Sequence, residues 1–259
     1  MRIPILLPES YLGHLQKMDG TRLRSHLLMV SVPTTRLHLS AVDRCLAMLD
    51  ALQAGYEPKQ SSAALRSLVR RMANVAMASL SLATEAYYQC SMSLQRDILE
   101  TGFLLEFFFR HPAEVEAWMS ADRQTLLRNY KPKKIRSRLG EDGADRDRIY
   151  ETFCEFATHP TTKGARMLLV DRDSAAAGPV LVPRSMQACI GELARNVPYF
   201  TVVACKLLVP QMPALEGDHQ SLLVFLREWI LECYKLQMST FNDDSMAAWA
   251  KKLWPPREA

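Results

Sequence analysis

Apolar residues recur at helical spacing along most of this 259-residue chain. Val42, Leu46, Leu49 and Leu52 fall on one face of a helix that Gly55 would end. Similar spacing predicts a helix that starts at Pro112 and further helices over residues 61–82, 85–109, 144–158, 184–208, 219–238 and 244–253. The sequence contains no repeat and no run of heptads, so the pattern predicts an all-α protein built as a helical bundle.

One stretch departs from the helical pattern. Residues 167–170 and 179–182 are short apolar runs, and a polar segment with alanines and a glycine separates them. Such a pair of runs predicts a small β-hairpin inserted near residues 166–183.

The remaining organisation follows from the helices and the prolines. Prolines at positions 4, 8 and 33 indicate an irregular N-terminal segment, within which residues 21–32 could form a short helix. We therefore expect a single helical domain over residues 1–259, with an irregular segment at 1–36, a core bundle at 37–170 and C-terminal helices that complete it at 184–254.

Composition excludes several classes of protein. Ten glycines are few for a Gly-rich nucleotide-binding fold, and the six cysteines show neither CxxC nor a short Cys–His spacing, which excludes zinc-ribbon and haem-attachment motifs. Scattered cysteines in apolar segments favour a reducing cytoplasm. The longest weakly polar stretch, 197–210, is too short to cross a bilayer. We expect a soluble cytoplasmic protein that needs no membrane and no cofactor.

Two ionisable pairs lie within otherwise apolar helical patterns. Arg96 and Glu100 are four residues apart in LQRDILETGFLLEFFFRHP, and Glu155 and His159 are four apart in YETFCEFATHP. Residues at i and i+4 share a helix face, and charges on apolar faces are costly unless they meet a partner. If the two helices are antiparallel neighbours, Arg96, Glu100, Tyr150, Glu155 and His159 converge on one polar cluster.

The cluster has a structural and a functional interpretation. Arg96 either forms an intrahelical salt bridge or holds an anion or carboxylate from another helix, since its planar fork suits both tasks. His159 either caps a helix end beside Glu155 or works with Glu155 as an acid–base pair, with Arg96 stabilising negative charge. A metal site is not expected, because a carboxylate site needs further ligands from facing helices and Arg96 would repel a cation.

A basic segment, RNYKPKKIRSR, lies between the two pairs. Its cations and Tyr130 are typical of a surface that contacts a nucleic-acid backbone and stacks on bases, although a solvated loop and helix would look the same. The candidate nucleic-acid-binding residues are Arg128, Lys131, Lys133, Lys134, Arg136 and Arg138.

The motifs over residues 62–170 resemble a broad family of uncharacterised bacterial helical proteins. The resemblance rests on the R-x-x-x-E helix, the acidic-start helix with Trp118, the KPKKIRSRL segment and the Y-x-x-x-C-E-F-A-T-H-P-T helix end. Its helix arrangement is similar to HEPN-type bundles, several of which are RNases or toxins in defence and toxin–antitoxin systems. The resemblance implies a bundle that is often dimeric, with Arg96, Glu100, Tyr150, Glu155 and His159 as signature positions.

The resemblance does not carry RNase activity over to this chain. HEPN RNases have four to six residues between an arginine and their histidine, and Thr152, Phe153 and Cys154 occupy the positions where that arginine would stand before His159. We expect a binding or regulatory component that recognises a nucleic acid or nucleotide. The sequence leaves two alternatives open: a HEPN-like RNase or toxin-type enzyme using His159 and Glu155, and a homodimer or partner-binding protein with a buried polar clamp.

Overall fold

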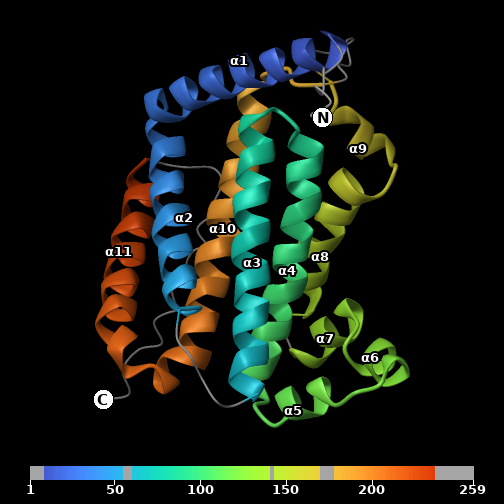
Figure 1. Ribbon diagram of the computed structural model, residues 1–259, viewed down its shortest axis with the longest axis vertical. Coiled ribbons are helices and arrows are strands. Elements are labelled where there is room, and N and C mark those ends of the chain that lie inside the picture. The colour runs from blue at the N-terminus through green and yellow to red at the C-terminus, as the bar shows by residue number, and fades with distance from the viewer. Residues whose placement is uncertain (1–8, 55–59, 141–142, 170–177, 237–259) are drawn as a thin grey trace, which may run out of the picture.

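Four long helices form the centre of the protein (Figure 1). They are α2 (Pro33–Ala51), α3 (Gln60–Thr84), α4 (Tyr88–Arg110) and α10 (Pro183–Leu208). The computed structural model describes residues 9–54, 60–140, 143–169 and 178–236, and every regular element within them is a helix. The all-α prediction is confirmed. None of the described helices is long and apolar enough to cross a membrane.

Helix α10 is the most central element, because it packs against α2, α3 and α4. Pro183 begins it at the first helical position, where the missing N–H costs nothing. Most of its side chains from Leu193 to Leu208 are apolar and buried, as expected for a helix that packs against several others. The C-terminal helices are therefore part of the core itself. Helix α11 (Glu216–Lys235) covers α2 and buries Trp229, and the helix predicted at 244–253 lies outside the described residues.

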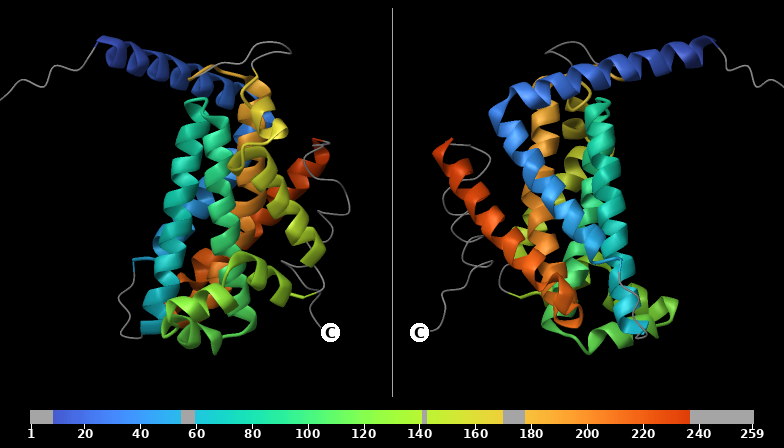
Figure 2. Two further views of the ribbon diagram at one scale, coloured as in Figure 1. Left: turned by 90° about the vertical axis from the view of Figure 1, so that its right-hand side faces the viewer. Right: turned by 60° about the vertical axis from the view of Figure 1, so that its left-hand side comes forward.

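The N-terminal segment is helical over more residues than predicted, since the sequence indicated an irregular chain with at most a short helix over residues 21–32. Helix α1 (Glu9–Ser31) lies across one end of the bundle, nearly perpendicular to the long helices (Figures 1 and 2). Pro33 does not interrupt the chain, because it occupies the first turn of α2. The prediction failed because the apolar residues of α1 are spread over two faces and give no single stripe.

Short helices fill the connection between α4 and α10, some of them beside α4 and others at the end of the bundle opposite α1 (Figure 1). They are α5 (Glu114–Met119), α6 (Arg123–Asn129), α7 (Pro132–Arg138), α8 (Gly143–Phe153), a π-helical turn (Cys154–Thr158) and α9 (Thr162–Arg166). Side-chain caps start two of them: Asp122 accepts from the Thr125 N–H at 2.7 Å, and Thr161 accepts from the Gly164 N–H at 2.9 Å.

The predicted β-hairpin near 166–183 is not seen. Met167 and Leu168 continue from α9 as a turn, and Leu169 is a single bridge residue with no described strand beside it. Residues 179–182 form no regular element and lead into α10, where the Val182 N–H donates to the Tyr88 hydroxyl at 3.0 Å. Apolar residues here serve to pack the connection against α4, since Val182 is buried in the core. Residues 170–177 lie outside the described part of the chain.

A glycine allows α4 and α10 to approach closely. A Cβ atom at Gly102 would lie 2.3 Å from the nearest ring atoms of Phe200, which is closer than side chains can come. The Phe200 ring also packs edge-on against Phe103, with ring centroids 5.5 Å apart. The contact fixes the spacing of the two most buried helices.

Gly102→Ala is expected to destabilise the protein by about 1–3 kcal/mol, because the added methyl group forces α4 and α10 apart. Urea unfolding of wild type and variant measures the difference. Gly217→Ala is the matched control, since a Cβ at Gly217 would meet nothing within 4 Å. Equal stabilities for the two variants would contradict the close approach.

Candidate functional site

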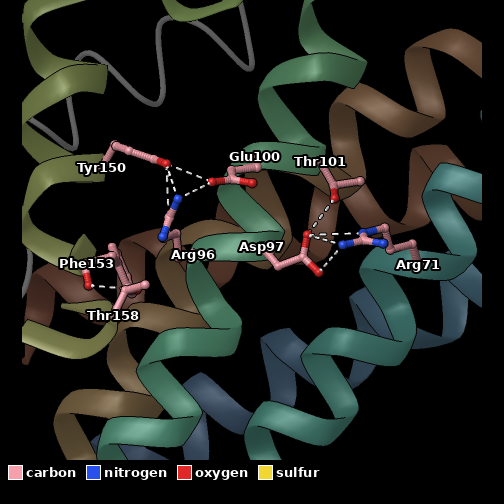
Figure 3. A network of polar contacts seen from close by, with 8 residues as sticks. All are labelled: Arg71, Arg96, Asp97, Glu100, Thr101, Tyr150, Phe153 and Thr158. Carbon is pink, nitrogen blue, oxygen red and sulfur yellow. Dashed lines mark hydrogen bonds and ion pairs between the residues drawn. The ribbon is translucent and has the colours of Figure 1, made fainter. Parts of the chain in front are cut away.

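Arg96, Glu100 and Tyr150 meet between α4 and α8 (Figure 3). The Tyr150 hydroxyl accepts hydrogen bonds from Arg96 Nε at 3.0 Å and Nη2 at 2.5 Å, and it donates to Glu100 Oε1 at 2.7 Å. Arg96 Nη2 also pairs with the same carboxylate oxygen at 2.9 Å. Arg96 and Glu100 share a face of α4, so a single phenol from α8 closes the triangle.

A second arginine covers the ring of Tyr150. The guanidinium carbon of Arg136, on α7, lies 3.7 Å from the ring centroid, and Arg136 Nε pairs with Asp147 of α8 at 2.5 Å. Burial, and next the hydrogen bond to Glu100, raise the pKa of Tyr150 to about 12. Tyr150 therefore stays protonated at neutral pH and serves as a link between α4, α7 and α8.

The next residue of α4 connects to a different helix. Asp97 pairs with Arg71 of α3 at 2.8 Å and accepts from the Thr101 hydroxyl at 3.4 Å (Figure 3). Polar contacts thus fix α4 on two sides.

Glu155 and His159 do not join the cluster. Glu155 pairs with Lys163 at 2.8 Å, and His159 is exposed, with extended backbone just after the π-helical turn. The expected i, i+4 contact fails because a π turn contains more residues than an α turn and because the helix ends at Thr158. Within the described residues, no hydrogen bond or ion pair joins the two side chains.

The structure divides the predicted basic surface into two groups. Arg136 is buried under α8, and Arg138 pairs with Glu114 at 2.5 Å while its guanidinium lies 4.4 Å from the ring centroid of Phe107. Those two arginines attach α7 to the rest of the protein. The other four cations are exposed on α6, α7 and the link between them: Arg128, Lys131, Lys133 and Lys134.

A second polar cluster was not predicted from the sequence. Glu106 of α4 is almost fully buried, and its Oε1 accepts from Arg110 at 2.6 Å and from Arg146 of α8 at 2.7 Å. Tyr199 of α10 lies close by, and burial together with Glu106 raises its pKa. The sequence held a signal, because Glu106 and Arg110 are also four residues apart and Glu106 stands between Leu105 and Phe107.

The two clusters favour a structural role for these charges. Arg96, Arg136 and Arg146 each have a carboxylate partner at 2.9 Å or less. Among the described residues, no group of three or more His, Cys, Asp or Glu side chains could hold a metal ion. Of the residues predicted to bind nucleic acid, Arg128, Lys131, Lys133 and Lys134 remain exposed and form no ion pair with another residue that the structure describes.

Comparison with known proteins adds no relative: no family model, no curated protein and no solved structure matches the chain. The resemblance to HEPN-type bundles therefore stays a prediction.

Arg96→Ala should lower the free energy of unfolding by roughly 1–3 kcal/mol, because it removes charge-assisted hydrogen bonds to Glu100 and Tyr150. A larger loss is not expected, since about a quarter of each charged side chain is exposed and water can solvate Glu100. His159→Ala should change stability by no more than about 0.5 kcal/mol. Thermal melts of both variants test this, and equal losses would contradict the separation of His159 from the cluster.

Glu106→Gln is expected to cost more, about 3–5 kcal/mol, because it removes the carboxylate that Arg110 and Arg146 share in the protein interior. Glu100→Gln, in the more exposed cluster, is the matched control and should cost about 1 kcal/mol. Chemical denaturation of the two variants gives the comparison. A Glu100→Gln loss equal to or above that of Glu106→Gln would show that burial does not set the difference.

Proposed function

We propose that this protein is a binding component for an anionic polymer, with a nucleic acid as its ligand, and that the contact surface is the exposed basic ridge on α6 and α7. We define the basic ridge as Arg128, Lys131, Lys133 and Lys134. The observation that carries the proposal is the exposure of these four cations together on two adjoining short helices.

The three lysines of the ridge are not balanced locally, whereas Arg128 lies near Asp122 and, after the hydrogen bonds from Thr125, helps to lower the pKa of that carboxyl. Residues 123–140 contain no acidic residue, and no ion pair joins any of the four cations to another residue that the structure describes. The nearby carboxylates are already engaged, since Glu114 pairs with Arg138 and Asp147 pairs with Arg136. An uncompensated group of exposed cations attracts phosphates and releases their counterions on binding.

The two arginines that pair with carboxylates of neighbouring helices support the ridge. Arg136 and Arg138 fix α7 against α8, Glu114 and Phe107, so the backbone that carries Lys131, Lys133 and Lys134 is held in place. A rigid ridge loses less conformational freedom on binding than a flexible basic segment would.

Tyr130 is committed to the protein rather than to a base. Its hydroxyl donates to Glu114 Oε2 at 2.6 Å, and its ring lies against Phe107 with centroids 6.4 Å apart. Without Tyr130 as a stacking platform, the ridge offers contacts to phosphates alone. We therefore infer binding through the backbone of the nucleic acid, with little preference for base sequence.

A triple variant, Lys131→Gln, Lys133→Gln and Lys134→Gln, tests the proposal by fluorescence anisotropy with a labelled single-stranded and a labelled double-stranded oligonucleotide. Each lost phosphate contact should reduce the slope of log K against log salt by about 0.7 for the single strand and about 0.9 for the duplex. We expect the triple variant to reduce the slope by about 2 to 3 and to bind several base sequences equally weakly.

The matched control removes three exposed cations elsewhere, Arg36, Arg184 and Arg227, by substitution with glutamine. It lowers the net charge by the same amount. If both triple variants weaken binding equally, the overall charge and not the ridge attracts the ligand, and the proposal is wrong. The absence of salt-dependent binding by the wild type would also overturn it.

A further inference from the structure

Helix α1 presents an apolar face to solvent. Leu12, Leu23, Leu27 and Val30 are 43%, 62%, 60% and 63% exposed. At 100° per residue these side chains fall on one side of the helix, directly opposite the buried Thr21, Ser25 and Met29. Gly13, Gln16 and Gly20 complete this outer face between Leu12 and Val30, and these seven positions hold no charged residue. We call these seven residues the outer face of α1. On the same side of the helix, Glu9 stands at the N-terminal end of α1, beyond Leu12.

The inner face of α1 is fully occupied by the protein's own bundle. The Thr21 hydroxyl donates to the Pro179 carbonyl at 3.0 Å, Arg22 pairs with Glu85 at 2.6 Å, and His14 is hydrogen-bonded to the Tyr87 hydroxyl at 2.9 Å. These contacts hold the helix in one orientation. Helix α1 itself lies across this end of the bundle, as both views in Figure 2 show.

We propose that the outer face of α1 binds the same face of a second copy of this chain, with the two helices antiparallel about a two-fold axis at Gly20. This inference is independent of nucleic-acid binding. Gly20 is the middle residue of α1 (Glu9–Ser31), so an axis there overlaps the two helices over their full length.

The outer face is complementary to itself under this symmetry. Gly13 and Leu27 stand seven residues on either side of Gly20, so Leu27 of one copy falls opposite Gly13 of the other. A Cβ at Gly13 or Gly20 would meet nothing within 4 Å, which leaves room for an incoming side chain and for close approach of the backbones. At the edge of the outer face, Val30 of one copy lies within one helical turn of Leu12 of the other.

The size of the patch predicts a weak dimer. Four aliphatic side chains that are about half exposed supply apolar area on the order of 300 Å² per copy, which is large enough to mark a contact site. A standard stable interface buries about 800 Å² per partner. We therefore expect association in the micromolar range.

The charged residues beside the outer face determine how dimerisation depends on salt. Lys17 and Arg24 lie on one flank of the outer face, and the two-fold axis at Gly20 places Arg24 of one copy within one turn of Lys17 of the other. Added salt screens this repulsion. Dimerisation should consequently strengthen with salt, whereas binding of nucleic acid to the basic ridge should weaken.

Sedimentation velocity over about 1 to 300 µM protein spans a micromolar Kd and measures the association. We expect Leu27→Glu to raise the Kd at least about tenfold, because the dimer then buries two unpaired carboxylates. Leu231→Glu is the matched control, since Leu231 is 51% exposed on α11, outside the outer face of α1, and should leave the Kd unchanged. A wild-type chain that remains monomeric over the whole range would overturn the proposal, and so would equal effects of the two substitutions.

Gly20→Cys tests the position of the two-fold axis. Two cysteines at the axis come close enough for a disulfide. Mild oxidation of Gly20→Cys should therefore link the two chains of the non-covalent dimer covalently. Wild type under the same conditions controls for the exposed Cys90, and Leu231→Cys controls for random collision. Cross-linking of Gly20→Cys no faster than of Leu231→Cys would exclude the antiparallel arrangement.

Discussion

Charged side chains of α4 are held by partners on α8, and this attachment governs much of the structure. Glu106 and Arg96 would be costly on a helix that packs into the core unless partners came to them. Arg146 and Tyr150 supply those partners from two turns of α8. Because Arg146 and Tyr150 are four residues apart on one helix, both contacts form in a single register, and a shift of α8 by one residue would break both.

This attachment also determines where the rest of the α4–α10 connection lies. Once α8 is fixed, Asp147 faces α7 and holds Arg136, and Arg138 is positioned to reach Glu114 and Phe107. Arg136 and Arg138, which the sequence predicts to bind nucleic acid, thus hold the helices of the protein together. The lysines just before them in the sequence remain exposed because lysine side chains solvate readily and hold no fixed geometry.

The sequence predicted the helices of the core and one of the two polar clusters. Arg96, Glu100 and Tyr150 were recognisable because a regular i, i+4 spacing survives folding. Glu155 and His159 looked equivalent, but a π turn replaced the α turn between them, and no spacing rule foresees that change. The inward position of Arg136 depends on Asp147, which belongs to another helix. The full length of helix α1 was not predicted, because one of its two apolar faces packs on the bundle and the other faces solvent, so its apolar residues form no single stripe.

The central place of α10 has a consequence for how the chain folds. Its contacts with α2 join segments more than a hundred residues apart, and the α5–α9 connection must be made before α10 can enter. During synthesis, α2, α3 and α4 emerge first and have no partner for the faces that α10 will cover. The bundle is thus completed late, and until then its largest apolar surface is open to chaperones or to aggregation.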